Sequence, residues 1–229
     1  MKEKIKCSFD EACKTYDFVS GVHVLSSSYL ADILRELNLQ PKSVLDVGCG
    51  TGNTSAELMK IYPNAEYTLC DLSEKMIQQA LLKVENSRSI VCDAEKYNFS
   101  KNYDLGVSNL AMQWFESIGL FLEKILKNCN YFAFSTLLDK SFSDCISLVG
   151  KCKIQNYPTS KELKRICQKH KLVRYEIKRY DLSFENQFGL ARYFKKLGAA
   201  FHSDPQNTRQ KLEGQKINLN YELAFAILQ

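Results

Sequence analysis

The segment 44–52 constrains the fold more than any other part of this sequence. The apolar, β-branched run 43–47 predicts a buried strand. Three glycines at alternate positions then predict a tight turn that lets the backbone approach a ligand closely; they are Gly48, Gly50 and Gly52. Residues 53–61 have the composition of a helix, so the turn leads into a helix N-terminus. A strand, a glycine loop and a helix start in this order are typical of a nucleotide-type site.

The spacing of the glycines excludes two common nucleotide loops. A dinucleotide-binding loop has the pattern Gly-x-Gly-x-x-Gly, but Thr51 and Asn53 stand where its third glycine would fall. A phosphate-binding P-loop needs Gly-Lys-Ser or Gly-Lys-Thr, and no lysine follows the glycines here. What remains is the pattern acid-x-Gly-x-Gly-x-Gly, which begins at Asp46, or a glycine-rich turn of some other α/β protein.

The remaining pattern resembles motif I of the class I S-adenosylmethionine-dependent methyltransferases. The resemblance implies that the loop wraps the amino acid end of the cofactor and that Asp46 helps hold its cationic amine, directly or through water. It also implies the fold: a Rossmann-like α/β sheet of seven strands, mostly parallel with the last strand antiparallel, flanked by helices. The loop residues expected to contact S-adenosylmethionine are Asp46, Gly48, Cys49, Gly50 and Gly52.

Hydrophobic patterning places the other elements along a single methyltransferase domain, 1–229. We expect further strands at 66–71, 90–92, 103–109, 131–137, 172–180 and 219–228, and helices at 118–127, 142–152 and 160–170. The N-terminal part, 1–39, is expected to form a flap in which residues 7–39 are helical in two pieces, the second at 26–39. The insertion 181–218 is too long for a hairpin loop. We interpret it as a helical substrate cap, with one helix at 187–197 and another that starts at Asp204-Pro205.

Composition and cysteine usage set the class of the protein. With 229 residues, 45% hydrophobic and 25% charged, the chain has the size and composition of one globular domain. Its net charge of +5 permits an acidic partner without requiring nucleic acid. The nine cysteines include no Cys-x-x-Cys pair and the three histidines are not at zinc-ligand spacing, which predicts free thiols and no metal site. Because no signal peptide or membrane-spanning run is visible, we expect a cytoplasmic protein without a membrane partner.

Two acids follow predicted strands and have expected roles at the cofactor. Asp71 ends its strand 25 positions after Asp46, close to the separation at which a strand-end carboxylate reaches a ribose diol. Helix capping is its alternative role, but Ser73 already occupies the N-cap position. The resemblance places Asp93 at the adenine amino group with Ala94 beside it; otherwise Asp93 is a turn former. The resemblance also adds Leu72, Met76, Ser108 and Asn109 to the expected cofactor contacts.

Other segments resemble one branch of the family, the malonyl-acyl-carrier-protein O-methyltransferases of biotin synthesis. The similarity runs through Phe9-Asp10, the stretch Ser108-Asn109-Leu110-Ala111-Met112-Gln113-Trp114, the stretch Phe134-Ser135-Thr136-Leu137, and 190–199. The chain departs from the branch at 96–99 and 128–130, which puts the geometry of these loops in doubt. It also has His23 where a glutamine is usual.

The resemblance implies transfer of the sulfonium methyl group to the free malonyl carboxylate. A carboxylate is ionised at pH 7, so no general base is expected. An always-charged guanidinium would suit the anion, and Arg192 on the cap is the candidate anchor, unless it is a solvated helix residue. Tyr16, Trp114 and Asn109 are expected to shape the reaction pocket.

The expected partner is an acidic carrier protein with a malonyl group on its phosphopantetheine arm, or malonyl-coenzyme A, bound by a monomer. A basic docking surface is expected on two helices; its residues are Lys164, Arg165, Lys169, Lys195 and Lys196. Two alternatives remain open. The chain could methylate a small carboxylic acid or a quinone precursor, or it could be a non-catalytic S-adenosylmethionine-binding assembly factor, for which the altered loop 128–130 is the only hint.

Overall fold

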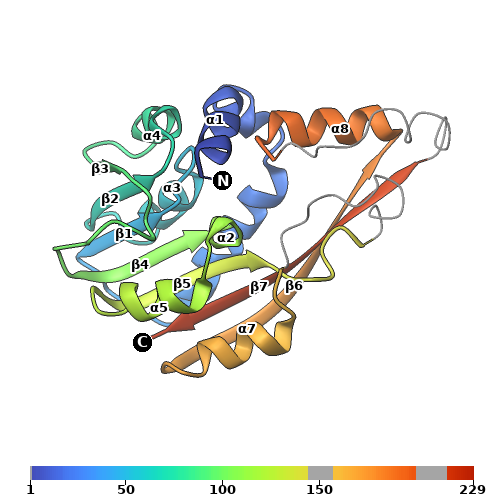
Figure 1. Cartoon of the computed structure of the whole chain (residues 1–229). Helices are drawn as coiled ribbons and strands as arrows, with labels where there is room; N and C mark the ends of the chain where they lie inside the picture. The colour runs from blue at the N-terminus through green and yellow to red at the C-terminus, as the bar shows by residue number, and fades with distance from the viewer. Residues whose placement is uncertain (1, 144–156, 200–215) are drawn as a thin grey trace.

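A seven-stranded sheet with the strand order β3-β2-β1-β4-β5-β7-β6 forms the centre of the computed structural model, which describes residues 2–143, 157–199 and 216–229 (Figure 1). The strands are β1 (Ser43–Val47), β2 (Glu66–Asp71), β3 (Arg88–Val91), β4 (Tyr103–Asn109), β5 (Cys129–Leu137), β6 (Leu172–Phe184) and β7 (Ile217–Leu228). Strands β1 to β5 pair in parallel, and β7 runs antiparallel to both β5 and β6. The predicted fold class is confirmed.

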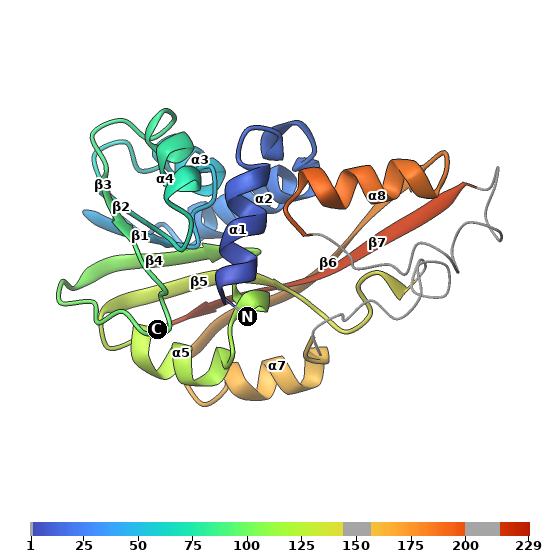
Figure 2. The ribbon, with the colours of Figure 1, turned by 45° about the horizontal axis from the view of Figure 1, so that its top comes forward.

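Helices cover both faces of this sheet (Figures 1 and 2). They are α1 (Lys2–Ala12), α2 (Gly21–Glu36), α3 (Asn53–Met59), α4 (Glu74–Leu81), α5 (Ile118–Ile125), α7 (Ser160–Cys167) and α8 (Gln187–Lys196), with short 3₁₀ turns η1 (Tyr16–Phe18) and η2 (Met112–Trp114). Helices α5 and α7 lie on one face, and α2, α3, α4 and α8 on the other. Among the described residues, no helix has both the length and the hydropathy needed to cross a membrane.

Strand β7 shows how the sequence makes two hydrophobic cores. Its odd-numbered residues from Leu219 to Ile227 pack in the core with α2 and α8. Ala224, Ala226 and Leu228 pack in the other core with α5 and α7. Because successive side chains of a strand point to opposite faces, one apolar strand can serve both cores.

The strand order reverses at β1, which places a ligand crevice at the carboxyl ends of the central strands. Strand β1 lies between β2 and β4, and all three run in parallel. Open α/β sheets bind ligands beyond the carboxyl ends of the strands at such a switch point. The glycine loop follows β1 directly and therefore lies at this crevice.

The N-terminal segment is helical earlier than its sequence pattern predicts. Helix α1 already begins at Lys2, and α2 begins at Gly21 rather than at residue 26, so the predicted start of the second piece was wrong. Between them, Asp17 is the acceptor that ties η1 to the glycine loop. Its carboxylate accepts hydrogen bonds from Thr51 Oγ1 at 2.6 Å and Lys83 Nζ at 2.7 Å.

The insertion between the last two strands is shorter than 181–218, because β6 and β7 pair as far as Phe184 and Ile217. Helix α8 confirms the helix predicted at 187–197. It is capped by Asn186, whose side chain accepts hydrogen bonds from two backbone N–H groups. The helix expected from Asp204-Pro205, and all but the first two residues of the helix expected at 142–152, lie outside the described residues.

Candidate active site

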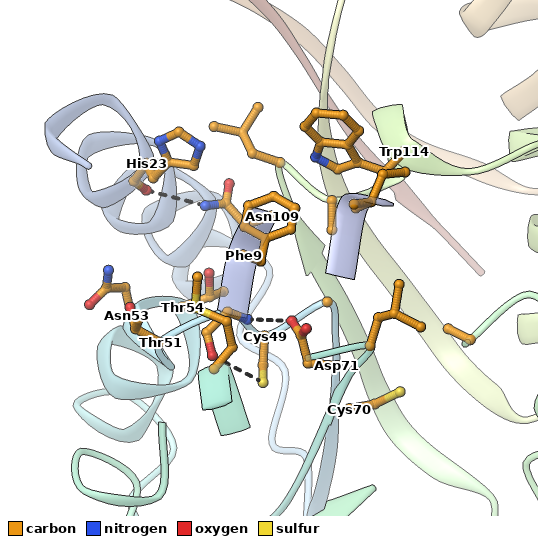
Figure 3. A pocket seen from close by; sticks show the side chains of 18 of the residues that line it. Phe9, His23, Cys49, Thr51, Asn53, Thr54, Cys70, Asp71, Asn109 and Trp114 are labelled. Atoms are coloured by element: carbon orange, nitrogen blue, oxygen red, sulfur yellow. Dashed lines mark hydrogen bonds between the residues drawn. The ribbon is translucent and has the colours of Figure 1, made fainter. Parts of the chain in front are cut away.

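A cavity of about 870 Å³, its open mouth included, lies at the carboxyl ends of β1, β2 and β4. Its wall comes from the glycine loop, the ends of these strands, and the N-terminal helices α1 and α2. In Figure 3, Asp71 and Cys70 lie toward one end of the cavity, and His23 and Trp114 toward the other. Its place at the switch point of an open α/β sheet is typical of small-molecule sites.

The glycine loop turns its backbone toward the cavity through hydrogen bonds to β2. Gly48 and Cys49 donate their N–H groups to Cys70 O at 2.7 and 3.0 Å, and Gly50 donates to Asp71 Oδ2 at 2.9 Å (Figure 3). A Cβ atom added at Gly50 would meet nothing within 4 Å, so this residue leaves open space on the cavity side. The loop therefore forms a cradle in which a ligand can come close to the backbone.

Gly52 has a different role from the one expected. It caps α3 with φ of 83° and does not line the cavity. An added Cβ would lie 3.0 Å from Ala80 Cα on α4. The third glycine of the motif is thus explained by close helix packing and by its left-handed backbone, not by ligand contact.

Asp71 lines the cavity and has the geometry of a strand-end acceptor. Its carboxylate accepts N–H groups of Gly50 at 2.9 Å and Ser73 at 2.8 Å. Burial raises the pKa of Asp71 above its usual range, while these hydrogen bonds act in the opposite direction. A diol that donates two hydrogen bonds would find a positioned acceptor here.

Asp46 is buried behind the wall and does not line the cavity. Its Oδ2 accepts a hydrogen bond from Ser55 Oγ at 2.7 Å, whereas Oδ1 has no partner among the described residues. Burial raises the pKa of Asp46 to about 7. An unpaired buried carboxylate oxygen beside the loop fits a nearby cation, held through an intervening group rather than by direct contact.

Helix α1 covers one end of the cavity. Four residues predicted to contact the cofactor line the wall there: Leu72, Met76, Asp93 and Ala94. The helix is tied down at Lys2. This residue forms ion pairs with Glu95 at 2.6 Å and Asp93 at 3.7 Å. The Lys2 contact was not predicted, because Glu95 is far away in sequence and only the fold brings the two together.

Three of the four residues expected at the reaction centre, Tyr16, Asn109 and Trp114, line the cavity. Phe9 packs between two of them, with ring centroids 6.4 Å from Tyr16 and 5.7 Å from Trp114. The neighbouring Ser108 does not reach the cavity. Its side chain is fully buried in the sheet and donates to Val47 O at 2.8 Å, which corrects its assignment as a cofactor contact.

Arg192, the fourth, is exposed and does not line the cavity. Helix α8 buries Leu190, Tyr193 and Phe194 against the core. Arg192 follows Leu190 by two residues, which turns it about 200° around the helix and away from the buried stripe. The described structure therefore does not support Arg192 as the anchor of a bound carboxylate.

His23 lines the cavity and was noted in the sequence only as a departure from a glutamine. Its ring packs edge to face on Tyr16 at 5.5 Å, and its buried Nδ1 has no partner among the described residues. Burial lowers the pKa of His23 to about 4, so the ring is neutral at pH 7. A cavity-lining imidazole without a protein partner is a functional candidate.

The depressed pKa of His23 predicts a pH-dependent stability. The unfolded chain takes up a proton near pH 6.5 but the folded chain only near pH 4, so the folded state loses stability as the pH falls between these values. We expect about 2 kcal/mol less free energy of unfolding at pH 5 than at pH 7.5 from this group. Urea unfolding of the wild type and of His23→Gln at both pH values measures it. An equal pH effect in both proteins would contradict the assignment.

The two basic helices do not form one surface. Leu163 and Cys167 of α7 pack in one core, while Leu190 and Tyr193 of α8 pack in the other, so the helices lie on opposite faces of the sheet (Figure 2). The expected docking surface of five basic residues is therefore wrong as a single patch. Lys195 and Lys196 remain near the cavity, because Lys196 O accepts a hydrogen bond from Thr15 Oγ1 at 3.2 Å, next to η1.

This chain is similar to known methyltransferases in sequence and in fold. The methyltransferase domain family matches residues 44–130. The malonyl-[acyl-carrier protein] O-methyltransferase of Priestia megaterium is 31% identical over 73% of this chain and 67% of its own length. That of Acetivibrio thermocellus is 28% identical over 99% of this chain and 88% of its own length. The plantazolicin methyltransferase BpumL, solved in complex with SAH, has a TM-score of 0.56 at 18% identity, covering 99% of this chain and 96% of that one. The chain belongs to the class I S-adenosylmethionine-dependent methyltransferases.

Proposed function

We propose that this protein transfers a methyl group from S-adenosylmethionine to the free carboxylate of a malonyl group carried on an acyl carrier protein, and so forms a methyl ester for biotin synthesis. The relatives that align along most of the chain are malonyl-[acyl-carrier protein] O-methyltransferases, which supports this acceptor. S-adenosylmethionine supplies an electrophilic methyl group on a sulfonium centre. The protein must place the acceptor and keep water away.

One observation carries the choice of an acidic acceptor: among the described residues, the reaction end of the cavity offers only weak bases. Burial raises the pKa of Tyr16, so its hydroxyl keeps its proton at pH 7, and burial lowers the pKa of His23 to about 4, so its neutral imidazole is a weak base. A carboxylic acid is already ionised and needs no proton removal. A neutral, aromatic wall suits such a nucleophile, because removal of water leaves the carboxylate more reactive.

We assign orientation of the carboxylate to His23 and Tyr16, with Trp114 as a wall, and a positioning role to Asn109. The Asn109 amide donates to His23 O at 3.2 Å and Ser27 Oγ at 3.0 Å, and its Oδ1 accepts from Ser26 Oγ at 2.6 Å. These bonds hold α2, which carries His23, against the end of β4. Placement of the reacting atoms is worth roughly 7–11 kcal/mol in favourable cases.

We further propose that residues 1–39 act as a flap and that the insertion between β6 and β7, which begins with α8, acts as a substrate cap of a single cytoplasmic domain, 1–229, that works as a monomer. The close packing of α1 against the end of α8 supports this arrangement. An added Cβ at Gly198, just after α8, would lie 2.9 Å from Phe9 of α1, and Phe9 lines the cavity. The end of the cap helix and the flap therefore meet beside the cavity.

The decisive experiment compares acceptors for the labelled methyl group of S-adenosylmethionine. We expect transfer to malonyl-acyl carrier protein, weaker transfer to malonyl-coenzyme A, and none to acetyl-acyl carrier protein, which lacks the free carboxylate. Faster transfer to free malonate or to a quinone precursor would replace the proposed acceptor. Tight binding of S-adenosylhomocysteine without turnover on any malonyl thioester would instead identify a non-catalytic assembly factor.

Charge reversal on α8 tests the docking of the carrier protein. We expect Lys195→Glu with Lys196→Glu to raise KM for malonyl-acyl carrier protein roughly tenfold and to change KM for malonyl-coenzyme A little, because only the carrier is a large acidic partner. The matched control is Lys42→Glu with Lys127→Glu. These exposed lysines lie just before β1 and β5, at the amino ends of the strands, whereas the cavity lies at the carboxyl ends. Equal effects of the α8 changes on both substrates would remove the docking surface.

A further inference from the structure

Two cysteines meet in the wall of the cavity. Cys70 lies near the end of β2, and Cys92 follows the end of β3 directly. Their Sγ atoms are 3.3 Å apart, and both residues line the cavity. The neighbouring backbones are joined as well, since the N–H group of Cys92 donates to Asp71 O at 2.9 Å. Nothing in the proposed methyl transfer uses these thiols.

The two thiols differ in accessibility and in acidity. Cys70 is fully buried, whereas Cys92 is partly exposed. The hydrogen bond from the Cys70 thiol lowers the pKa of Cys92 and raises that of Cys70. Lys124 further favours the Cys92 thiolate, while Asp71 and Asp93 oppose it. Cys92 is thus the attacking thiolate of the pair, and Cys70 is placed to react second.

We propose that Cys70 and Cys92 form a redox-modification site, which a low-molecular-weight disulfide converts into an intramolecular disulfide that weakens cofactor binding. The Cys92 thiolate attacks one sulfur of the reagent and releases the other as a thiolate. Cys70 then loses its proton and attacks the Cys92 sulfur of the mixed disulfide, which releases the second thiol. Two protein thiols are oxidised and one disulfide is reduced to two thiols. The Sγ atoms must approach from 3.3 Å to about 2.05 Å, a small movement.

The position of the cross-link explains its expected effect. Each cysteine directly precedes an acid of the cofactor site, Asp71 and Asp93, so a bond between the sulfurs ties together the backbones that carry these carboxylates. The effect is reciprocal, because a ligand that favours the reduced form must also protect it. We therefore expect oxidation to lower affinity for S-adenosylhomocysteine roughly tenfold, and bound S-adenosylhomocysteine to slow oxidation. The inference depends on the cofactor site and not on the acceptor.

Peptide mapping and binding measurements on the full chain test this site. The protein is treated with oxidised glutathione, with and without S-adenosylhomocysteine, and digested with trypsin. Cleavage after Lys60, Lys75, Arg88 and Lys96 puts Cys70 on peptide 61–75 and Cys92 on peptide 89–96. We expect these two peptides to be joined, less so when S-adenosylhomocysteine is present. Calorimetry then measures the affinity of the reduced and oxidised protein.

Single substitutions decide between this pair and the other cysteines. Cys92→Ser should bind S-adenosylhomocysteine equally well before and after oxidant, whatever its own affinity. Cys70→Ala should instead keep glutathione on Cys92 as a mixed disulfide and form no cross-link between peptides 61–75 and 89–96. Cys7→Ser, at an exposed position on α1, should remain as sensitive as the wild type. Three results would each overturn the proposal. Oxidation lowers the affinity of Cys92→Ser, a different cross-link dominates, or the cross-link between peptides 61–75 and 89–96 leaves the affinity unchanged. Methyl transfer by the reduced protein tests the proposed function separately.

Discussion

Replacing Asp71 by alanine is expected to lower the affinity for S-adenosylhomocysteine roughly 100-fold, or about 3 kcal/mol. The substitution removes a cavity-lining acceptor that two backbone N–H groups hold in place, one of them from Gly50 of the glycine loop. A diol then loses its charge-assisted partners, and the loop loses one of its anchors to β2. Calorimetric titration of the purified variant measures the loss.

A matched acid separates ligand binding from loss of stability. Asp104 also accepts hydrogen bonds from two backbone N–H groups, those of Lys42 at 2.8 Å and Ser43 at 3.1 Å. It lies at the amino ends of β1 and β4, away from the cavity. Asp104→Ala should cost comparable stability and leave the affinity for S-adenosylhomocysteine unchanged. If both variants lose the same affinity, or if Asp71→Ala retains full affinity, Asp71 is not the acceptor that we assign.

Gly48→Ala is expected to lower the free energy of unfolding by about 3 kcal/mol, whereas Gly50→Ala should cost only about 1 kcal/mol. Both glycines have positive φ, 69° and 53°, so the backbone strain is matched. A Cβ at Gly48 would lie 2.3 Å from Ala111 Cβ, while one at Gly50 would project into open space. Urea unfolding measures the difference. Gly50→Ala should instead weaken S-adenosylhomocysteine binding roughly tenfold, because its methyl group enters the cradle.

A second substitution tests the cause of the larger loss. Ala111→Gly removes the Cβ atom that the new methyl group would meet, so Gly48→Ala with Ala111→Gly should recover much of the lost stability beyond the cost of Ala111→Gly alone. Strict additivity of the two single effects would show that the clash is not the cause. Equal destabilisation of Gly48→Ala and Gly50→Ala would show the same.

The parts of the site that lie close to one strand end were predictable from the sequence. Asp71 and Asp93 follow parallel strands, and parallel strands end at the same edge of a sheet, so their approach to the glycine loop follows from the order of the elements. The cavity wall includes both acids. Their roles toward the cofactor stay predictions, as do those of Tyr16 and Trp114.

Other contacts could not be predicted, because they depend on how helices pack. The Lys2 to Glu95 ion pair joins residues far apart in sequence, and nothing local in the chain marks either partner. Arg192 shows the opposite failure. It lies in a stretch that resembles the family, but the buried stripe of α8 turns its side chain to solvent.

The sequence by itself determined the strand, glycine loop and helix at 44–59 and the order of the elements, because backbone conformation at glycines and hydrophobic periodicity are local properties. It also marked the methyl donor through the acid and glycines of that loop. Only the tertiary structure decided that Gly48 and Gly50 line the cavity while Gly52 packs on Ala80. It also decided that His23 reaches the cavity while Ser108 does not, and that Cys70 and Cys92 touch. These are outcomes of long-range packing, in which small differences in helix orientation move a side chain from a cavity to solvent or to the core.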